Sequence, residues 1–301
     1  MTPDSLGSRL TAMLSALTTK VAPGSERAPS DDAPAPVERS APMKKGYAWV
    51  NGLRMYYEVH GEGGTPLVLL HGGGSTIETS FARILPMLDQ KRQVIAVEFQ
   101  AHGHTRDADR AFTFEQDADD VAGVLAHLRV EKADVLGFSN GGTTALQLAI
   151  RHAELVEHLI VASANYRKDG MHDWFWDFMQ KGTFADMPQV YKDEYLKINS
   201  SNDDLHRMYE RDSKRMLTFH DIGDEEIKQI AAPTLVVAGD QDVVRPEHAV
   251  ELSRLVQHGR LCILPGNHGS YLGEIMSPHV HHSVPERFVA IVEEFLASDG
   301  T

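Results

Sequence analysis

Short, continuous apolar runs recur along this chain and alternate with segments of helical spacing. Runs of this length without polar alternation are typical of strands buried on both faces of a sheet. Between two of them, Val121, Val124, Leu125 and Leu128 follow i, i+3, i+4, i+7 spacing, which predicts an amphipathic helix, and residues 288–296 repeat that pattern. Alternating strands and helices predict a mostly parallel, twisted sheet with helices on both faces, an α/β fold. The apolar runs are residues 67–70, 94–97, 133–136, 159–161, 235–237 and 261–264.

The chain before the first run divides into two parts. Residues 1–45 hold six of the 14 prolines and a long polar stretch, which predicts a disordered or partly helical tail or linker. After them, Asn51-Gly52 joins two segments rich in strand-forming residues, which predicts a β-hairpin closed by a type I′ turn.

One interval interrupts the alternation of strands and helices. About 70 residues separate the strand ending near Ser163 from the one starting at Thr234, far more than a normal connection in an α/β fold. We therefore expect a helical cap at residues 165–228, inserted into an α/β core made of residues 46–164 and 229–301.

The predicted cap carries an aromatic cluster near its start. Trp174, Phe175, Trp176 and Phe178 lie within five positions. Helical packing of the cap against the core explains such a cluster, and so does a lid whose aromatic face walls a pocket. We expect both, with these four side chains contributing apolar surface to substrate binding.

Composition narrows the functional classes. The 301 residues include 43 acidic and 29 basic side chains, a net charge of −14 that disfavours binding to nucleic acid. The single cysteine, Cys262, cannot form an internal disulfide and lies in an apolar run, where a buried hydrophobic residue is expected. No stretch of about 18 apolar residues predicts a membrane span. These features favour a cytoplasmic location over export.

A serine lies on a predicted strand-to-helix turn. The sequence Gly-Phe-Ser-Asn-Gly at residues 137–141 follows the run at 133–136 and precedes a helix expected to end near His152. Glycines on both sides of Ser139 permit a tight turn and leave the hydroxyl open to a substrate. The helix N-terminus adds a positive dipole and a free backbone N–H at Asn140. Ser139 is therefore the predicted nucleophile.

A glycine-rich turn supplies candidate donors for a developing oxyanion. His71-Gly72-Gly73-Gly74 directly follows the run at 67–70. The backbone N–H groups of Gly73 and Asn140 are predicted to form the oxyanion hole. A flexible turn without this role is the alternative. We expect His71 itself to hold the loop in place.

Position selects a base among the 16 histidines. His268 follows the last apolar run, at the edge where open α/β sheets place their ligand-binding loops. Asp242 follows the preceding run and is placed to orient that imidazole. The predicted triad is therefore Ser139, Asp242 and His268, in that chain order. Asp240 is the alternative acid, or a residue that caps the turn.

Taken in order, these motifs resemble the α/β-hydrolase fold family, which includes bacterial carboxylesterases, lactonases and capped C–C bond hydrolases. The resemblance covers roughly residues 46–297. Residues 98–105 are similar to the family turn DxRGHGxS, with Glu98, Gln100 and Ala101 as departures that shape a loop. Residues 239–242 with Pro246 resemble GDxD…P, in which the second acid, here Asp242, belongs to the triad.

A group of histidines near the C-terminus suggests a metal site at first sight. His279, His281 and His282 with Glu286 match no recognised zinc spacing, so we interpret them as a solvated loop. The sequence predicts neither a metal nor an organic cofactor.

These inferences predict a serine hydrolase that cleaves a carboxylic ester of a small, partly apolar substrate through an acyl-enzyme on Ser139. The alternatives on the same triad are a capped C–C or amide hydrolase and a cofactor-free perhydrolase. A small-molecule receptor with a hydrolase fold is a third hypothesis. The expected partner is a small molecule, and the sequence is compatible with either a monomer or a homodimer.

Overall fold

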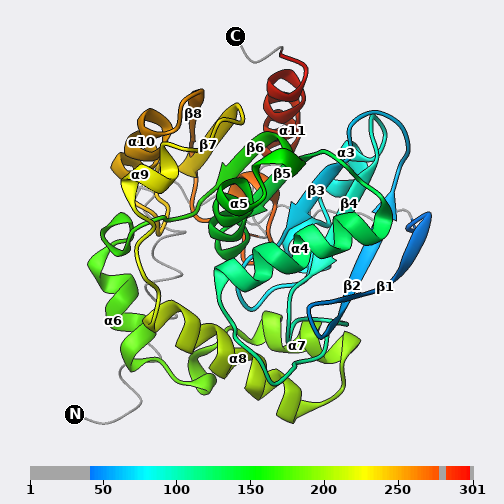
Figure 1. Ribbon diagram of the computed structural model, residues 1–301. Coiled ribbons are helices and arrows are strands. Elements are labelled where there is room, and N and C mark those ends of the chain that lie inside the picture. Colours follow the sequence, from blue (N-terminus) through cyan, green and yellow to red (C-terminus); the bar gives the residue numbers. More distant parts are fainter. Residues whose placement is uncertain (1–40, 278–282, 299–301) are drawn as a thin grey trace, which may run out of the picture. The chain divides into compact units, whose positions relative to one another are not determined.

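An eight-stranded sheet organises residues 41–277 and 283–298, which this computed structural model describes (Figure 1). Its strands are β1 (Lys44–Val50), β2 (Leu53–His60), β3 (Leu67–Leu70), β4 (Val94–Glu98), β5 (Ala133–Phe138), β6 (Val156–Ala162), β7 (Thr234–Gly239) and β8 (Gly259–Leu264). Their order in the sheet is β1-β2-β4-β3-β5-β6-β7-β8. β2 pairs antiparallel with β1 and β4, and the other pairings are parallel. The predicted α/β class with a mostly parallel sheet is confirmed.

The hairpin that opens the fold closes as the sequence predicted. Asn51 and Gly52 have φ angles of 45° and 81°, the left-handed region that a type I′ turn requires at both central residues. β1 and β2 pair along their length on either side of this turn. The hairpin therefore adds two antiparallel strands to one edge of the parallel sheet.

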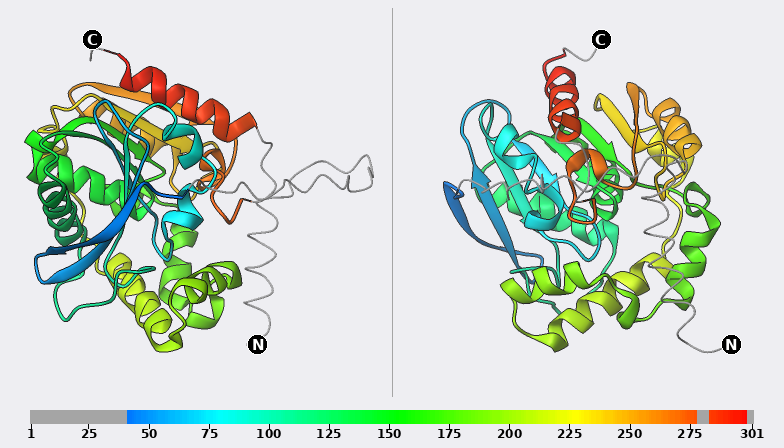
Figure 2. Two further views of the ribbon diagram at one scale, coloured as in Figure 1. Left: turned by 90° about the vertical axis from the view of Figure 1, so that its right-hand side faces the viewer. Right: turned by 180° about the vertical axis from the view of Figure 1, so that it is seen from behind.

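Apolar side chains cover both faces of the central strands. Val68 and Leu70 of β3 belong to one buried cluster, whereas Leu67 and Leu69 belong to another, because successive strand residues point to opposite faces. α4, α5, α9 and α10 pack on the first face and α2, α3 and α11 on the second, which Figures 1 and 2 show from opposite sides. These helices are α2 (Ile77–Phe81), α3 (Leu85–Leu88), α4 (Phe114–Leu128), α5 (Asn140–Arg151), α9 (Asp224–Ile227), α10 (Pro246–Leu255) and α11 (Ser283–Leu296).

β8 differs from its prediction. The run at 261–264 was expected to be buried on both faces, but Leu261 and Ile263 are 41% and 37% exposed. β8 is the last strand in the sheet order, and only its other face, with Cys262 and Leu264, packs on the core. Cys262 is partly buried, and this burial raises the pKa of its thiol. A run of apolar residues at an edge strand is thus covered on one face.

The long interval between β6 and β7 contains several helices. We call residues 163–233 the insert. The insert contains, in chain order, the 3₁₀ turn η2 (Lys168–Gly170), α6 (Asp173–Lys181), the 3₁₀ turn η3 (Phe184–Asp186), α7 (Gln189–Ile198), α8 (Asn202–Leu217) and α9. Figure 1 shows α6, α7 and α8 grouped at one side of the sheet. Two further 3₁₀ turns, η1 (Ala153–Leu155) and η4 (Ser270–Leu272), lie outside the insert.

Candidate active site

Ser139 occupies a tight turn between β5 and α5. Its backbone has φ 54° and ψ −122°, a conformation that non-glycine residues rarely adopt. A Cβ atom on Gly137 would lie 2.1 Å from the Gly141 carbonyl oxygen, and one on Gly141 would lie 2.1 Å from the Leu70 carbonyl oxygen. Both flanking glycines are therefore required by close backbone packing, and the strain at Ser139 is held by that packing.

The structure brings the three predicted triad residues together. His268 Nε2 lies 3.0 Å from Ser139 Oγ, and His268 Nδ1 lies 2.7 Å from Asp242 Oδ1. Because an ionised carboxylate only accepts hydrogen bonds, Nδ1 carries the proton of the neutral ring. The lone pair of Nε2 then faces the Ser139 hydroxyl, the arrangement of a general base.

The surroundings of this pair shift both pKa values in opposite directions. Burial lowers the pKa of His268, but the Asp242 carboxylate and, less strongly, Glu274 outweigh it and raise that pKa above its ordinary value. Burial raises the pKa of Asp242, but His268 and hydrogen-bond donors leave it below its ordinary value. The carboxylate is therefore ionised and stabilises a positive charge on the ring.

Three groups besides His268 donate hydrogen bonds to the Asp242 carboxylate. Its Oδ2 accepts hydrogen bonds from the Ser163 hydroxyl and from the Gly239 N–H at 3.1 Å, and its Oδ1 accepts from the Val244 N–H at 3.3 Å. The Ser163 hydroxyl also lies 2.6 Å from the buried Tyr271 hydroxyl. The sequence did not reveal these contacts, because Ser163 reaches Asp242, and Tyr271 reaches Ser163, from distant parts of the chain.

The alternative acid, Asp240, lies in another environment. Its Oδ1 accepts the Gly266 N–H at 2.7 Å, between the loops that follow β7 and β8. The side chain is exposed, whereas Asp242 is buried. Asp240 thus makes the turn-capping contact that the sequence offered as its other role.

The glycine-rich turn after β3 is held by His71. This ring is fully buried, donates from Nδ1 to the Gly72 carbonyl oxygen at 2.7 Å and accepts the Phe99 N–H at Nε2 at 3.1 Å. Burial lowers the pKa of His71 to about 3, so the ring is neutral, as one donor and one acceptor position require. His71 therefore connects the loops after β3 and β4.

The same turn lies directly beside the nucleophile. A Cβ atom on Gly72 would lie 3.4 Å from Ser139 Cβ, and one on Gly73 would lie 2.4 Å from Asn140 Nδ2. Gly73 and Asn140 are thus neighbours at the start of α5, where backbone N–H groups have no acceptor within the helix. Their role as an oxyanion hole stays a prediction, which this proximity favours.

The aromatic cluster of α6 contacts other apolar side chains. Phe175 and Trp176 pack on a cluster formed by Phe114, Met216 and Phe219. Within α6, the Phe175 ring contacts the rings on either side of it in an edge-on arrangement. Trp174, Phe175, Trp176 and Phe178 are all half-buried, and the contacts described for them do not include the Ser139 hydroxyl. Their contribution to a substrate pocket stays a prediction.

Two buried acids of this region were missed by sequence reasoning. Glu274, six residues after His268, accepts the Tyr191 hydroxyl of α7 at 2.6 Å and the Met276 N–H at 2.7 Å. Burial raises the pKa of Glu274 to about 7. Asp212 of α8 reaches the loop after β3, where its Oδ2 lies 2.6 Å from the Gly74 nitrogen. Neither acid belongs to a recognisable motif, because each contact depends on how the insert is packed.

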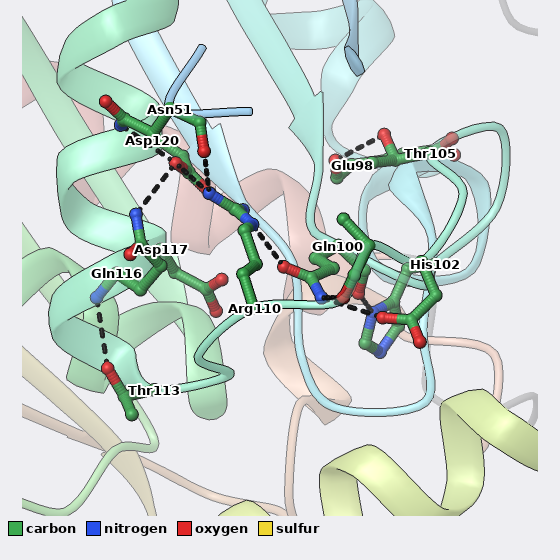
Figure 3. Close-up of polar contacts among 12 residues, drawn as sticks. Asn51, Glu98, Gln100, His102, Thr105, Arg110, Thr113, Gln116, Asp117 and Asp120 are labelled. Carbon is green, nitrogen blue, oxygen red and sulfur yellow. Dashed lines mark hydrogen bonds and ion pairs between the residues drawn. The ribbon is translucent and has the colours of Figure 1, made fainter. Parts of the chain in front are cut away.

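The loop after β4 has its own polar anchor, which Figure 3 shows. Arg110 Nε donates to Gln100 Oε1 at 2.7 Å, and its guanidinium pairs with Asp120 of α4. Gln100 in turn donates to Asp107 Oδ1 at 2.7 Å. Gln100, one departure from the family turn, therefore shapes this loop, which also carries His102.

At the start of the neighbouring helix α4, only one half of a reciprocal capping box forms. Thr113 Oγ1 accepts the Gln116 N–H at 3.2 Å, which caps α4. The Gln116 side chain instead donates to Asp120 Oδ1 at 3.1 Å (Figure 3). The Gln116 amide thus bonds to Asp120, the acid that also pairs with Arg110, and not to the backbone of Thr113.

Metal-binding groups and membrane-spanning helices can be assessed for the described part of the chain. Residues 41–277 and 283–298 contain no group of three or more side chains suited to hold a metal ion. The histidines at 279, 281 and 282 lie outside the described residues. No helix of that same part has the length and apolar content needed to cross a membrane.

Comparison with known proteins assigns the class. The family model described as the alpha/beta hydrolase fold matches residues 65–273. This range spans the glycine-rich turn, the Ser139 turn and His268. The chain therefore belongs to the alpha/beta hydrolase fold family, and it is a hydrolase.

Similar proteins carry more specific names. Human "Serine hydrolase BPHL" is 26% identical over 264 residues, covering 82% of this chain and 84% of that protein. The "2-hydroxymuconate semialdehyde hydrolase" of Pseudomonas sp. strain CF600 is 28% identical over 259 residues, covering 78% of this chain and 87% of that protein. A solved meta-cleavage product hydrolase from Pseudomonas fluorescens IP01 has a TM-score of 0.65 at 21% identity, covering 85% of this chain and 97% of that one. The structural likeness shows the shared fold.

Proposed function

We propose that this chain is a serine hydrolase that cleaves a carboxylic ester of a small, partly apolar substrate through an acyl-enzyme on Ser139. The observation that carries the proposal is the 3.0 Å contact between Ser139 Oγ and His268 Nε2, with Asp242 2.7 Å from the other ring nitrogen. A serine hydroxyl becomes an effective nucleophile when a base lies within hydrogen-bond reach and a third group orients that base.

The geometry supports a two-stage acyl transfer. Ser139 Oγ attacks the ester carbonyl carbon while His268 Nε2 takes the hydroxyl proton. When the bond to the alcohol oxygen breaks, the imidazolium returns that proton to the leaving alkoxide. Water then attacks the acyl-enzyme with His268 again as base, which releases the acid and restores Ser139. Asp242 holds the ring tautomer and stabilises its cation, and these steps require no cofactor.

The negative charge of the tetrahedral intermediate needs donors next to Ser139. We assign this role to the N–H groups of Gly73 and Asn140, as the sequence predicts. Their adjacency supports the assignment, and so does the positive end of the α5 dipole. A direct donor of this kind typically contributes about 10²- to 10³-fold to kcat.

We further propose that the insert acts as the cap expected at residues 165–228, over a core of residues 46–164 and 229–301. Its side chains Tyr191 and Asp212 contact the loops that follow β8 and β3, which supports this placement. Trp174, Phe175, Trp176 and Phe178 then supply apolar surface that favours a hydrophobic acyl or alcohol group. A cytoplasmic location stays a prediction from composition.

A second candidate is hydrolysis of a C–C bond on the same triad. It is favoured by the similarity to proteins named 2-hydroxymuconate semialdehyde hydrolase and 2-hydroxy-6-oxo-2,4-heptadienoate hydrolase, at 28% and 25% identity. The triad alone does not separate the two, since leaving group and pocket shape decide which bond breaks.

A labelling experiment tests the nucleophile, and a substrate panel tests the bond. A fluorophosphonate probe is expected to modify Ser139, as mapped by mass spectrometry, and Ser139→Ala is expected to abolish labelling and ester turnover. Ser253→Ala is the matched control, since this α10 hydroxyl donates to the Val250 carbonyl and is expected to leave labelling intact.

The panel compares aryl esters of increasing acyl length with vinylogous diketones and aminoacyl amides. Ester turnover that depends on Ser139 supports the proposal, and activity confined to the diketones selects C–C hydrolysis. Ester turnover that persists in Ser139→Ala would contradict the proposed mechanism.

A further inference from the structure

The insert places a buried carboxylate on the glycine-rich turn beside Ser139. Asp212, on α8, is 9% exposed, and its Oδ2 accepts the Gly74 N–H at 2.6 Å. A Cβ atom on Gly73 would lie 3.3 Å from the same oxygen. The carboxylate thus contacts the peptide that follows Gly73, the residue assigned to the oxyanion hole.

Asp212 belongs to a chain of alternating charges that links insert and core. Its Oδ2 lies 2.9 Å from His102 Nε2, and its Oδ1 lies 2.5 Å from Arg215. Arg215 also donates to Asp117 Oδ2 at 2.5 Å. His102 and Asp117 are core residues, labelled in Figure 3, whereas Asp212 and Arg215 come from α8. All four side chains are buried, so these ion pairs connect the insert to the core and are not screened by solvent as surface pairs are.

Hydrogen-bond chemistry determines the charge of His102. Its Nδ1 faces the Gln100 carbonyl oxygen at 2.8 Å, and its Nε2 faces the Asp212 carboxylate. Both partners only accept, so both ring nitrogens carry protons and the ring is a cation. The Gly74 N–H, which also lies 3.2 Å from Nε2, therefore has Asp212 as its acceptor. His102 and Arg215 together offset the negative charge of Asp212 near the proposed oxyanion.

A glycine turn needs such an anchor, because residues without a Cβ have more backbone freedom to lose. Gly74 has φ +65°, and the peptide that carries its N–H begins at the Gly73 carbonyl carbon. Fixing that peptide fixes one of the two peptide planes that meet at the Gly73 Cα, and so restricts the direction of the adjacent Gly73 N–H.

Resting on the proposed function, we infer that Asp212 is a positioning residue. Through the Gly74 N–H it holds the Gly73 N–H in its oxyanion-binding orientation, so that the oxyanion hole is complete only when the insert is docked on the core. Asp212 itself does not contact the reacting atoms. The inference ties the chemistry of the core to one side chain of the insert.

Steady-state kinetics on the full chain test this, with an aryl ester that the wild type hydrolyses and with sites counted by fluorophosphonate labelling. Asp212→Ala removes the acceptor, and kcat per labelled site is expected to fall roughly 100-fold, the scale of a misplaced catalytic group, with KM nearly unchanged. Asp212→Asn retains an acceptor oxygen of the same reach and is expected to restore most of this loss, to within roughly 10-fold of wild type.

Arg211→Gln is the matched control. Arg211 precedes Asp212 on α8 and pairs with Asp107 of the core at 3.0 Å, so its loss weakens insert docking without touching the glycine turn. Its kcat is expected to stay within about threefold of wild type, as for a partly exposed ion pair. If Asp212→Ala does not fold, the test compares Asp212→Asn with Arg211→Gln. Asp212→Asn is then expected to lose up to roughly 10-fold in kcat, more than the loss of at most about threefold in Arg211→Gln.

Three results would overturn the inference: wild-type kcat in Asp212→Ala, a loss confined to KM, or an equal fall of kcat in Arg211→Gln. Ser139→Ala, assayed in parallel, separates this from failure of the proposed function. Turnover that persists in Ser139→Ala would overturn both, whereas turnover that needs Ser139 but not Asp212 would overturn the inference alone.

Discussion

Two histidine–carboxylate pairs contact the proposed active site, one at Ser139 and the other at the glycine-rich turn, and they differ in one partner. His268 Nδ1 is 2.7 Å from Asp242, and His102 Nε2 is 2.9 Å from Asp212. The other nitrogen of His268 faces the Ser139 hydroxyl, whereas the other nitrogen of His102 faces a backbone carbonyl oxygen.

This difference decides what each ring can do. A hydroxyl can donate to a neutral imidazole, so His268 keeps a lone pair with which to take a proton. A carbonyl oxygen only accepts, so His102 keeps both protons and can only balance charge. Its pKa is raised above the ordinary value because the Asp212 carboxylate outweighs the effect of burial. A buried carboxylate beside a histidine therefore does not by itself define a catalytic base.

The largest expected effect separates the two rings directly. His268→Gln removes the proposed base and is expected to lower kcat by about 10⁴-fold, the upper end of what general acid–base catalysis contributes. His102→Gln leaves the base intact and is expected to lower kcat by about 10-fold, through the glycine turn. Kinetics on an aryl ester, with melting temperatures as the check on folding, measure both. Losses of equal size in the two folded variants would remove the distinction.

The next effect concerns stability on the Asp212 side. Arg215→Met leaves Asp117 and Asp212 buried without their shared cation, and the free energy of unfolding is expected to fall by about 3–5 kcal/mol. Urea denaturation at neutral pH measures it. Arg211→Gln serves as control with an expected loss of at most about 1 kcal/mol. A similar, small loss in both would mean that the buried chain contributes no more than a surface pair.

A smaller effect on activity is expected on the Asp242 side. Ser163→Ala removes one hydrogen bond to the Asp242 carboxylate, and a bond to a charged group of this kind corresponds to about a 10-fold fall in kcat. Tyr271→Phe keeps the Ser163–Asp242 contact and is expected to lose less. Turnover by Ser163→Ala at the wild-type rate would show that the remaining donors orient Asp242 unaided.

The smallest effect is on pH dependence. The proposed base works deprotonated, so kcat/KM should rise with pH through the pKa of His268, with a midpoint above the ordinary value of about 6.5. Glu274→Gln removes the weaker of the two carboxylates that raise this pKa. Its midpoint is expected to move down by less than about one pH unit, because Glu274 is itself only partly ionised near pH 7.

A pH–rate profile of kcat/KM makes that measurement. Asp240→Asn is the control. It removes an exposed carboxyl from the loop after β7 and should leave the midpoint in place. A midpoint that moves upward in Glu274→Gln would contradict the electrostatic assignment.

Much of the fold was predictable because its signals are local. The run at 133–136 and Gly137, Ser139 and Gly141 together specify a strand, a tight turn and a helix start. Their steric reasons lie within a few residues, as the close approach of Gly137 to the Gly141 carbonyl shows. His268 was selected by its place after the last apolar run, and the structure brings it to Ser139 as expected.

The rest depended on which elements become neighbours. The exposure of Leu261 follows from the place of β8 at the edge of the sheet, which no local pattern records. The contacts of Asp212 with Gly74 and of Tyr191 with Glu274 join residues 138 and 83 positions apart.

The amino-acid order alone thus determined the alternation of elements and the residue types available at each strand end, because hydrophobic periodicity and glycine sterics act over short distances. Only the tertiary structure decided which histidine faces a hydroxyl and which a carbonyl, since a ring's second partner comes from a distant segment. The same reason separates a proposed base from a charge-balancing cation in this protein.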